Sequence, residues 1–290
     1  MKRKKYFLAI FLLMILVLTG CSKNNSQKNI ITTTVNTYNE PVQSIVGDKY
    51  QVEPIIKSVN VDPHSFSPST NNSKQVADSK LIVANGLGYD DWINKMVTAN
   101  SQQKNFIDFG NVLGLKNGDN EHIWFGVDHM KKLSKAVYQH MTRVDVNSKN
   151  YYYVNYKKYT HKLDHLSDRE KSIKKIAQGK VAYVTEPLPY YLLKDIGVKI
   201  ADTHFAKAIE EDTDPSIKDV NDMEQGMKDH KVDFIVVNKQ VSSSIITKMM
   251  DTAKHYHIPI VYFTETLPSD VGYYSWMSDN LDQIEKVVKE

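Results

Sequence analysis

The chain has 290 residues, of which 41% are hydrophobic and 24% are charged, and its formal net charge is +3. This length and composition fit two moderate globular domains or one large one. Residues 1–20 hold four positive charges and no negative ones, so the rest of the chain carries a net charge of −1. The basic balance therefore belongs to the N-terminus, and the remaining sequence gives no indication of nucleic-acid binding.

The N-terminus is predicted to be an export signal. Basic residues 2–5 precede an uncharged apolar run from Tyr6 to Leu18, which is short for a membrane span. The next residues, Leu18-Thr19-Gly20-Cys21, resemble a bacterial lipobox, which implies a signal peptide of residues 1–20 and attachment of lipid to the Cys21 thiol. An uncleaved anchor helix with an incidental cysteine is the alternative. Residues 21–29 are expected to form a flexible, polar tether.

Cysteine use limits the chemistry of the exported part. Cys21 is the only cysteine in the chain, so we expect no internal disulfide and no thiolate metal site. A single lipid-modified cysteine accounts for this count in an exported protein.

Strands and helices alternate from residue 30 to residue 126. The β-branched run Ile30–Val35 predicts a first buried strand. Further strands are predicted at 50–56, 81–84 and 105–108, with helices at 38–46, 73–79 and 90–98. This alternation predicts an N-terminal lobe with a parallel sheet. The run from Gly86 to Asp91 begins like a dinucleotide-binding loop, but Asp91 stands where the third glycine belongs, so we interpret it as a plain turn.

The middle of the chain, residues 127–178, is predicted to be a helical connector. Apolar residues recur at helical spacing from Met130 to Met141, and residues 147–177 form the longest stretch without a convincing strand. Ser167-Asp168-Arg169-Glu170 resembles a capping box, which predicts a break and a second short helix there. We interpret the segment as a rigid spine between two lobes.

The strand and helix pattern restarts in residues 179–290. Strands are predicted at 180–184, 198–201, 232–237 and 259–263, and the main helices at 217–229, 242–255 and 274–288. The acidic residues Glu210, Glu211, Asp212 and Asp214, which lie near His204, are expected to form a solvated loop, with a second site as the alternative. The predicted fold is therefore α/β, with two parallel-sheet lobes joined by a long rigid connector helix.

Four polar residues each follow the carboxyl end of a predicted strand. They are His64 and His122 in the first lobe and Glu186 and Glu265 in the second. In open α/β sheets ligands bind at this edge. Two facing lobes would bring two imidazoles opposite two carboxylates, which suits a divalent first-row metal with nitrogen and oxygen ligands.

Several motifs together resemble one family. They occur in this order: Asp62-Pro63-His64-Ser65-Phe66-Ser67-Pro68, Asn85-Gly86-Leu87-Gly88 followed by Asp91-Trp92, His122-Ile123-Trp124, a long helix with Tyr151 to Leu163, Thr185-Glu186, and Thr264-Glu265-Thr266-Leu267-Pro268. From about residue 30 to the C-terminus the chain resembles the zinc/manganese substrate-binding lipoproteins of ABC importers. The resemblance implies two α/β lobes, a metal ion in the cleft between them, and delivery of that ion to a permease with a cytoplasmic ATPase.

The resemblance also implies a ligand set. His64 and His122 match the two histidine ligands of the N-terminal lobe, and Glu186 matches the third ligand. Glu265 falls where the fourth ligand, usually aspartate, is found, and Asp270 remains the alternative.

The sequence departs from the family in ways that leave the metal open. Glu121 stands before His122, where members usually have proline. Two carboxylates favour manganese, whereas zinc normally binds such a set more tightly. Some zinc-specific relatives carry a long His-rich loop before the second histidine, and residues 115–120 are short and contain no histidine.

Two other classes of function compete with metal import. The chain has neither His-Glu-x-x-His nor Gly-x-Ser-x-Gly, so a metal-dependent hydrolase is disfavoured and we expect no enzyme. A surface adhesin or structural lipoprotein would leave the placement of the four candidate ligands unexplained. The favoured prediction is a monomeric, extracytoplasmic protein that is held to the cell membrane by a lipid anchor and carries Mn²⁺ or Zn²⁺.

Overall fold

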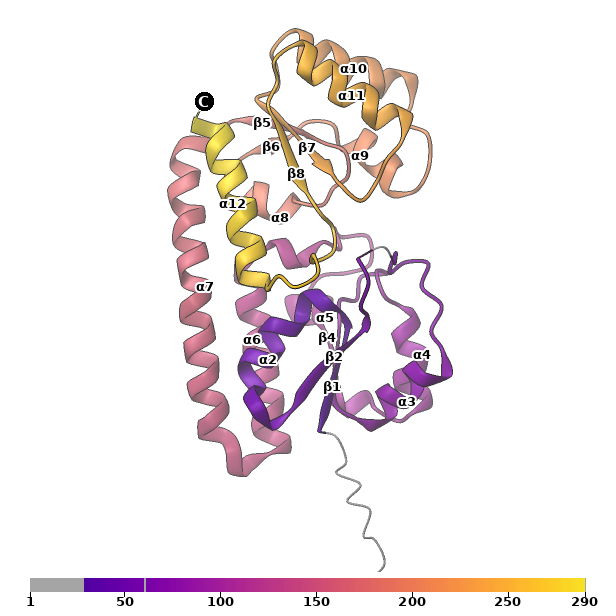
Figure 1. Cartoon of the computed structure of the whole chain (residues 1–290), viewed down its shortest axis with the longest axis vertical. Coiled ribbons are helices and arrows are strands. Elements are labelled where there is room, and N and C mark those ends of the chain that lie inside the picture. The colour runs from indigo at the N-terminus through magenta and orange to yellow at the C-terminus, as the bar shows by residue number, and fades with distance from the viewer. Residues whose placement is uncertain (1–28, 60, 290) are drawn as a thin grey trace, which may run out of the picture.

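The computed structural model describes residues 29–59 and 61–289. Two α/β lobes lie one above the other, and one long helix runs beside both (Figure 1). The predicted signal peptide and the lipidation site Cys21 lie outside the described residues. Within the described residues, no helix has both the length and the apolar character needed to cross a membrane.

The first lobe, called the N-lobe here, is built on a parallel sheet with the strand order β2-β1-β3-β4. The strands are β1 (Ile30–Val35), β2 (Gln51–Ile56), β3 (Ser79–Ala84) and β4 (Phe106–Asp108). The helices between and after them are α2 (Asn39–Val46), α3 (Thr70–Asp78), α4 (Trp92–Ala99) and α5 (Phe109–Leu113). Residues 31–35 of β1 are all buried, as expected for a central strand covered on both faces.

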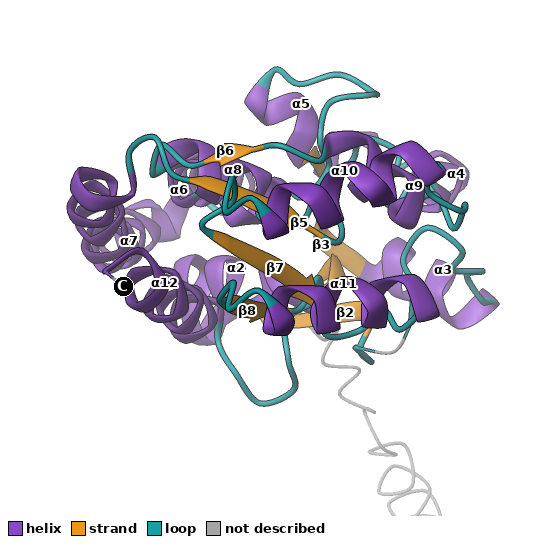
Figure 2. Cartoon of the chain, turned by 90° about the horizontal axis from the view of Figure 1, so that it is seen from above, coloured by secondary structure: helices purple, strands orange, loops and turns teal. Residues whose placement is uncertain are grey.

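The second lobe, the C-lobe, repeats this topology with the strand order β6-β5-β7-β8, again parallel. Its strands are β5 (Val181–Val184), β6 (Lys199–Ile200), β7 (Phe234–Asn238) and β8 (Ile260–Phe263). Its helices are α8 (Tyr190–Asp195), α9 (Thr203–Glu210), α10 (Ile217–Lys228), α11 (Ser244–His255) and α12 (Tyr273–Lys289). Helices α10 and α11 lie nearest the viewer in Figure 2, at the end of the molecule away from the N-lobe. The predicted α/β fold with two parallel-sheet lobes is confirmed.

The segment between the sheets consists of α6 (Val127–Val144) and α7 (Lys149–Ala177). The predicted break at Ser167 is wrong, because α7 is continuous over 29 residues. Ser167 is buried, and its hydroxyl accepts a hydrogen bond from Lys131 Nζ (2.8 Å) instead of capping a new helix. A helix of this length extends about 44 Å. It packs against α6, against α2 of the N-lobe and against α12 of the C-lobe, beside which it runs in both views (Figures 1 and 2).

The two lobes also share a buried apolar contact. Phe125 lies just before α6. The centroid of its ring is 5.7 Å from that of Phe263 and 5.1 Å from that of Trp276, both in the C-lobe. The Tyr273 hydroxyl donates a hydrogen bond to the Trp124 carbonyl oxygen (2.7 Å). This contact and α7 together favour small relative movements of the lobes over a wide hinge motion.

The turn after β3 carries a buried carboxylate, Asp90, that positions the start of α4. Its oxygens accept hydrogen bonds from the backbone N–H groups of Asn85 (2.8 Å) and Gly86 (2.9 Å). Gly86 has φ +76°, and a Cβ atom there would lie 2.3 Å from Asp108 Oδ1, so glycine is required. The Asp90 carboxylate is therefore the hydrogen-bond acceptor for two buried backbone N–H groups of this turn.

Replacing Asp90 with alanine is expected to lower the free energy of unfolding by about 2–4 kcal/mol, because two buried donors lose their acceptor. Urea unfolding followed by circular dichroism would measure the change. The matched control is Asp91→Ala, which removes an exposed neighbouring carboxylate that makes no capping hydrogen bond and should cost less than about 0.5 kcal/mol. Equal losses for the two variants would contradict this role of Asp90.

Candidate metal centre

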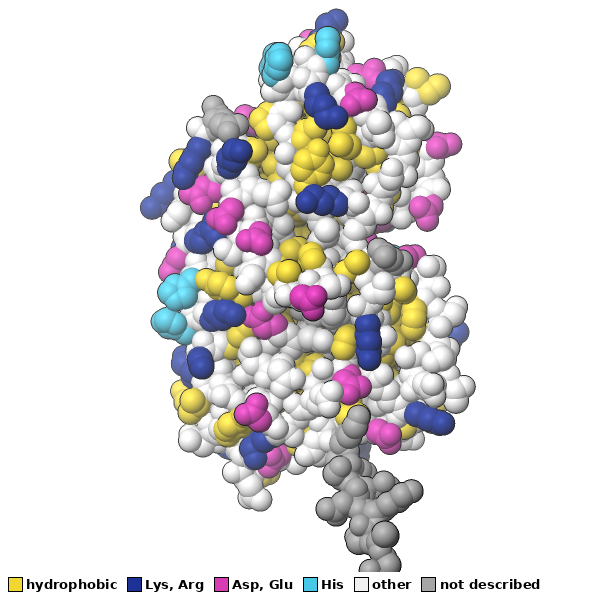
Figure 3. Space-filling view, in the orientation of Figure 1, with side chains coloured by type: hydrophobic (Ala, Val, Ile, Leu, Met, Phe, Trp, Pro, Cys, Tyr) yellow, Lys and Arg dark blue, Asp and Glu magenta, His cyan; other side chains and the backbone are white. Residues whose placement is uncertain are grey.

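A cavity of about 670 Å³ lies between the lobes and is called the cleft cavity here. Figure 3 shows the groove between the lobes at the right-hand edge of the molecule. Seven carboxylates and a single lysine, Lys207, line the cavity, together with two histidines. The acidic residues are Asp62, Glu121, Glu186, Glu210, Glu211, Asp212 and Glu265. Such an excess of negative charge between low-dielectric walls attracts cations.

His64 reaches the cavity from the loop after β2. The Asp62 carboxylate accepts its backbone N–H (2.9 Å), and Trp92 Nε1 donates to the Pro63 carbonyl oxygen (3.0 Å), so the loop is held at two points. The imidazole is 41% exposed, and its Nε2 lies 2.9 Å from Glu121 Oε1. This hydrogen bond to Glu121 raises the pKa of His64 to about 9.

His122 is the most enclosed of the candidate ligands, with 2% of its side chain exposed. Its ring lies edge-on to Trp124, with the centroids 5.2 Å apart, and its backbone N–H donates to Asn120 Oδ1 (2.9 Å). Burial lowers the pKa of His122 to about 4. The Nδ1 atom has no hydrogen-bond partner among the described residues and lies 3.8 Å from Glu210 Oε1. A neutral imidazole with a free nitrogen is the form that a metal ion requires.

Glu186 follows β5 in the C-lobe. The side chain is 7% exposed, and Asn238 Nδ2 donates a hydrogen bond to its Oε2 (2.5 Å). Burial raises the pKa of Glu186 to about 7, although the bond from Asn238 opposes this shift.

Glu265 follows β8, which is an edge strand of the same sheet. The Tyr89 hydroxyl of the N-lobe donates to its Oε1 (3.0 Å), and burial raises the pKa of Glu265 to about 7. The alternative fourth ligand, Asp270, is exposed and is absent from the described residues that line the cleft cavity. The geometry therefore favours Glu265 over Asp270.

The four candidate ligands line one cavity, but three of them are turned toward other partners. His64 is paired with Glu121, Glu186 with Asn238, and Glu265 with Tyr89. The tightest group of metal-ligating atoms in the described part of the chain is instead Glu121, His122 and Glu210, one atom from each within 4.8 Å of the others. A metal ion held by all four candidates would require their side chains to turn inward.

Glu210 is one of the cleft residues that sequence analysis did not select as a ligand. The expectation of a solvated loop is wrong for Glu210, which ends α9 and is 16% exposed, although Glu211 and Asp212 are exposed. The missed signal is the helical spacing of Phe205, Ala206 and Ile209, which are buried on one face of α9.

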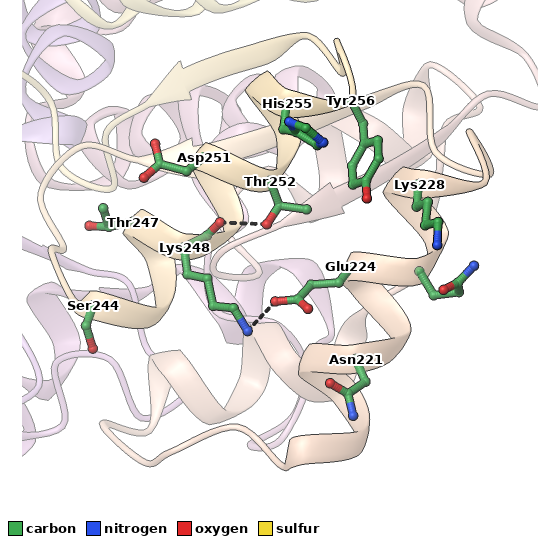
Figure 4. A pocket seen from close by; sticks show the side chains of 11 residues that line it. Asn221, Glu224, Lys228, Ser244, Thr247, Lys248, Asp251, Thr252, His255 and Tyr256 are labelled. Atoms are coloured by element: carbon green, nitrogen blue, oxygen red, sulfur yellow. Dashed lines mark hydrogen bonds and ion pairs between the residues drawn. The ribbon is translucent and has the colours of Figure 1, made fainter.

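A larger hollow, of about 820 Å³, lies on the outside of the C-lobe between α10 and α11 (Figure 4). Its charged side chains largely neutralise one another, as in the ion pair between Lys248 and Glu224. One histidine, His255, lines it, and no group of three metal-ligating side chains among the described residues falls there. The outer hollow therefore lacks the chemistry of the cleft.

Comparison with known proteins identifies the family. The sequence profile described as zinc-uptake complex component A, periplasmic, matches residues 31–287. The chain belongs to this family. Among curated relatives, the metal ABC transporter substrate-binding lipoprotein FimA of Streptococcus parasanguinis is 28% identical, with 98% of both chains covered. The manganese ABC transporter substrate-binding lipoprotein PsaA of Streptococcus pneumoniae is 27% identical with the same coverage.

Solved structures of similar proteins share the fold. The metal-dependent lipoprotein YcdH from Bacillus subtilis matches with a TM-score of 0.72 and 24% identity, covering 89% of this chain and 98% of that one. The substrate-binding protein FpvC from Pseudomonas aeruginosa in complex with Mn²⁺ matches with a TM-score of 0.73 and 19% identity, covering 90% and 98%. The predicted resemblance to zinc/manganese substrate-binding lipoproteins is thus confirmed.

The Tyr89 hydroxyl gives a direct test of how the cleft orients Glu265. Tyr89→Phe keeps the ring that packs against His64 and Trp124 but removes the hydrogen bond to Glu265. We expect metal affinity to fall about tenfold, which is typical when a ligand loses its hydrogen-bond partner. Calorimetric titration would measure it, with Tyr153→Phe on the exposed side of α7 as the control. Unchanged affinity would show that Tyr89 does not orient Glu265 for binding.

Proposed function

We propose that this zinc-uptake family member captures one divalent ion, Mn²⁺ or Zn²⁺, in the cleft cavity and delivers it to the permease of an ABC importer. The proposed ligands are His64, His122, Glu186 and Glu265, called the four-ligand set. The observation that supports this most strongly is that side chains from both lobes line one acidic cavity at the carboxyl ends of the two sheets. Two neutral imidazoles and two carboxylates would hold a doubly charged ion with no net charge.

Binding would require small rearrangements around His122. His122 is already neutral and free at Nδ1, so it would serve as the fixed ligand. His64 would leave Glu121 and lose its proton, while Glu186 and Glu265 would each turn the other carboxylate oxygen to the ion and keep the hydrogen bonds from Asn238 and Tyr89. The broken pair of His64 and Glu121 opposes binding and so favours reversible capture, which suits a protein that must give its ion up.

The rest of the chain would place the protein beside its permease. Residues 1–20 would be removed as a signal peptide, Cys21 would carry the lipid, and residues 21–29 would be the tether. Residues 30–126, 127–178 and 179–290 would act as N-terminal lobe, connector and C-terminal lobe of a monomer outside the membrane. The side chains of the cleft hold an ion without performing a reaction, so the proposed role is transport and not catalysis.

The four-ligand set and the relatives both bear on which metal is bound. Two carboxylates and two imidazoles can bind either ion: oxygen ligands suit Mn²⁺, whereas the general order of affinities places Zn²⁺ above Mn²⁺. Manganese is named for the PsaA relatives, whereas the Bacillus subtilis relative ZnuA, 23% identical, is named as part of a high-affinity zinc uptake system. We propose manganese as the principal cargo because half of the four-ligand set is oxygen and residues 115–120 contain no histidine.

Calorimetric titration of metal-stripped residues 22–290 with Mn²⁺ and Zn²⁺ tests this proposal. We expect one equivalent of ion to bind, and cellular manganese content to fall when the gene is deleted. Failure to bind any divalent ion stoichiometrically would overturn the importer role and favour the adhesin or structural lipoprotein.

A further inference from the structure

A group of three side chains beside the four-ligand set already has the spacing of a metal site. Glu121 and His122 come from the loop before α6, and Glu210 comes from the end of α9 in the C-lobe. One ligand atom from each lies within 4.8 Å of the others. We call these residues the Glu-His-Glu set. Unlike the four-ligand set, it needs little rearrangement to surround an ion.

The free nitrogen of His122 is an independent sign that this set binds a ligand. The side chain is 2% exposed, and its Nδ1 has no hydrogen-bond partner among the described residues. The atom faces Glu210 Oε1 at 3.8 Å, which is too long for a hydrogen bond. A buried polar atom without a partner is costly unless something else binds it. A cation between the imidazole and the carboxylate would satisfy both.

Lys207 fixes the orientation of Glu210 in this arrangement. Its Nζ lies 3.1 Å from Glu210 Oε2, so the other oxygen, Oε1, is left directed at His122. Lys207 is the only lysine or arginine among the described residues that line the cleft cavity, and seven carboxylates line the same cavity. The local charge therefore still favours a bound cation.

The Glu-His-Glu set also stands on a boundary between two hollows. A second interlobe cavity of about 630 Å³ is lined by Tyr190 and Tyr191 of α8 and by residues before and within α9. Glu121, Lys207 and Glu210 line both this cavity and the cleft cavity. An ion that enters from either side would meet these carboxylates next to His122.

We propose that Glu121, His122 and Glu210 form a second position for a divalent cation, which the ion occupies on its way into or out of the four-ligand set. The inference rests on the proposed function, because it concerns the same ion. Two carboxylates and one imidazole suit an oxygen-preferring ion such as Mn²⁺. A neutral imidazole has only one nitrogen free to coordinate, so the two positions share His122 and hold one ion at a time.

The test removes the C-lobe half of the four-ligand set and asks what remains. The mature chain with Glu186→Gln and Glu265→Gln keeps side-chain volume and hydrogen-bonding capacity, and circular dichroism would verify that it folds. Electron paramagnetic resonance of free Mn²⁺ would measure binding. We expect one Mn²⁺ per chain, with affinity at least about a hundredfold below that of the unsubstituted chain.

Adding Glu210→Gln to that double variant should weaken the residual binding by at least about tenfold. Adding Asp214→Asn, which changes an exposed carboxylate four residues away that does not line the cleft cavity, should change the residual binding less than about twofold. Pulsed resonance of Mn²⁺ bound to the double variant should show coupling to one imidazole nitrogen, lost in the His122→Ala form.

The outcomes separate this inference from the proposed function. If the unsubstituted chain binds Mn²⁺ but the double variant does not, or if Glu210→Gln leaves its residual binding unchanged, the second position is overturned and the proposed function stands. If the double variant binds Mn²⁺ as tightly as the unsubstituted chain, and Glu210→Gln abolishes binding in both proteins, the second position is supported and the four-ligand set is wrong. If the unsubstituted chain binds no ion, both fail.

Discussion

His122→Ala is expected to weaken binding of both Mn²⁺ and Zn²⁺ by far more than the roughly hundredfold that follows the loss of a ligand's hydrogen-bond partner. His122 is a member of both proposed coordination sets, so its loss leaves neither intact. It is also the candidate ligand that needs no proton removed, because burial holds its pKa at about 4. Calorimetric titration of the metal-stripped variant would measure the loss.

The matched control for this variant is His140→Ala. His140 is also nearly inaccessible, with 3% of its surface exposed, but it lies 18 residues along the chain, in the second half of α6. Both variants remove a buried imidazole, so both should lower stability, whereas only the loss of His122 should remove metal binding. Tight binding by His122→Ala would contradict every ligand set proposed for this cleft.

The fold could be predicted from sequence because its local signals agree with its tertiary structure. Apolar runs such as residues 81–84 lie within strands that are buried on both faces, and turn residues separate them from amphipathic helices. The capping-box signal at Ser167 failed because packing overrode it. Ser167 and Ile173 are buried where α7 runs along its neighbours, and a continuous helix buries more apolar surface than a broken one.

The candidate site could be predicted only in part. The rule that ligands gather at the carboxyl ends of parallel strands led to His64 and Glu186, and both line the cleft cavity. It gave no reason to select Glu121 or Glu210. Their closeness to His122 depends on how the lobes meet, and Glu210 is 89 residues away from Glu121 in the chain. A contact of this kind leaves no local pattern in the sequence.

The affinity for Mn²⁺ is expected to fall steeply as the pH is lowered, by on the order of a thousandfold or more from pH 8 to pH 6. The bound ion requires all four ligands to be deprotonated. At pH 7 His64, with a pKa of about 9, carries a proton, and His122, with a pKa of about 4, does not. Glu186 and Glu265, with pKa values of about 7, are each about half protonated. Binding at pH 7 should therefore release about two protons, rising toward three at pH 6 and falling to about one at pH 8.

Calorimetric titration in buffers with different ionisation enthalpies measures this proton release directly. Glu121→Gln is the informative variant, because the Glu121 carboxylate is the main cause of the raised pKa of His64. In that variant His64 should titrate near its ordinary pKa of about 6.5, so the proton released at pH 8 should nearly disappear while the release at pH 6 persists. If the variant and the unsubstituted chain release the same number of protons at pH 8, His64 does not lose a proton when the ion binds. That result would remove His64 from the ligand set.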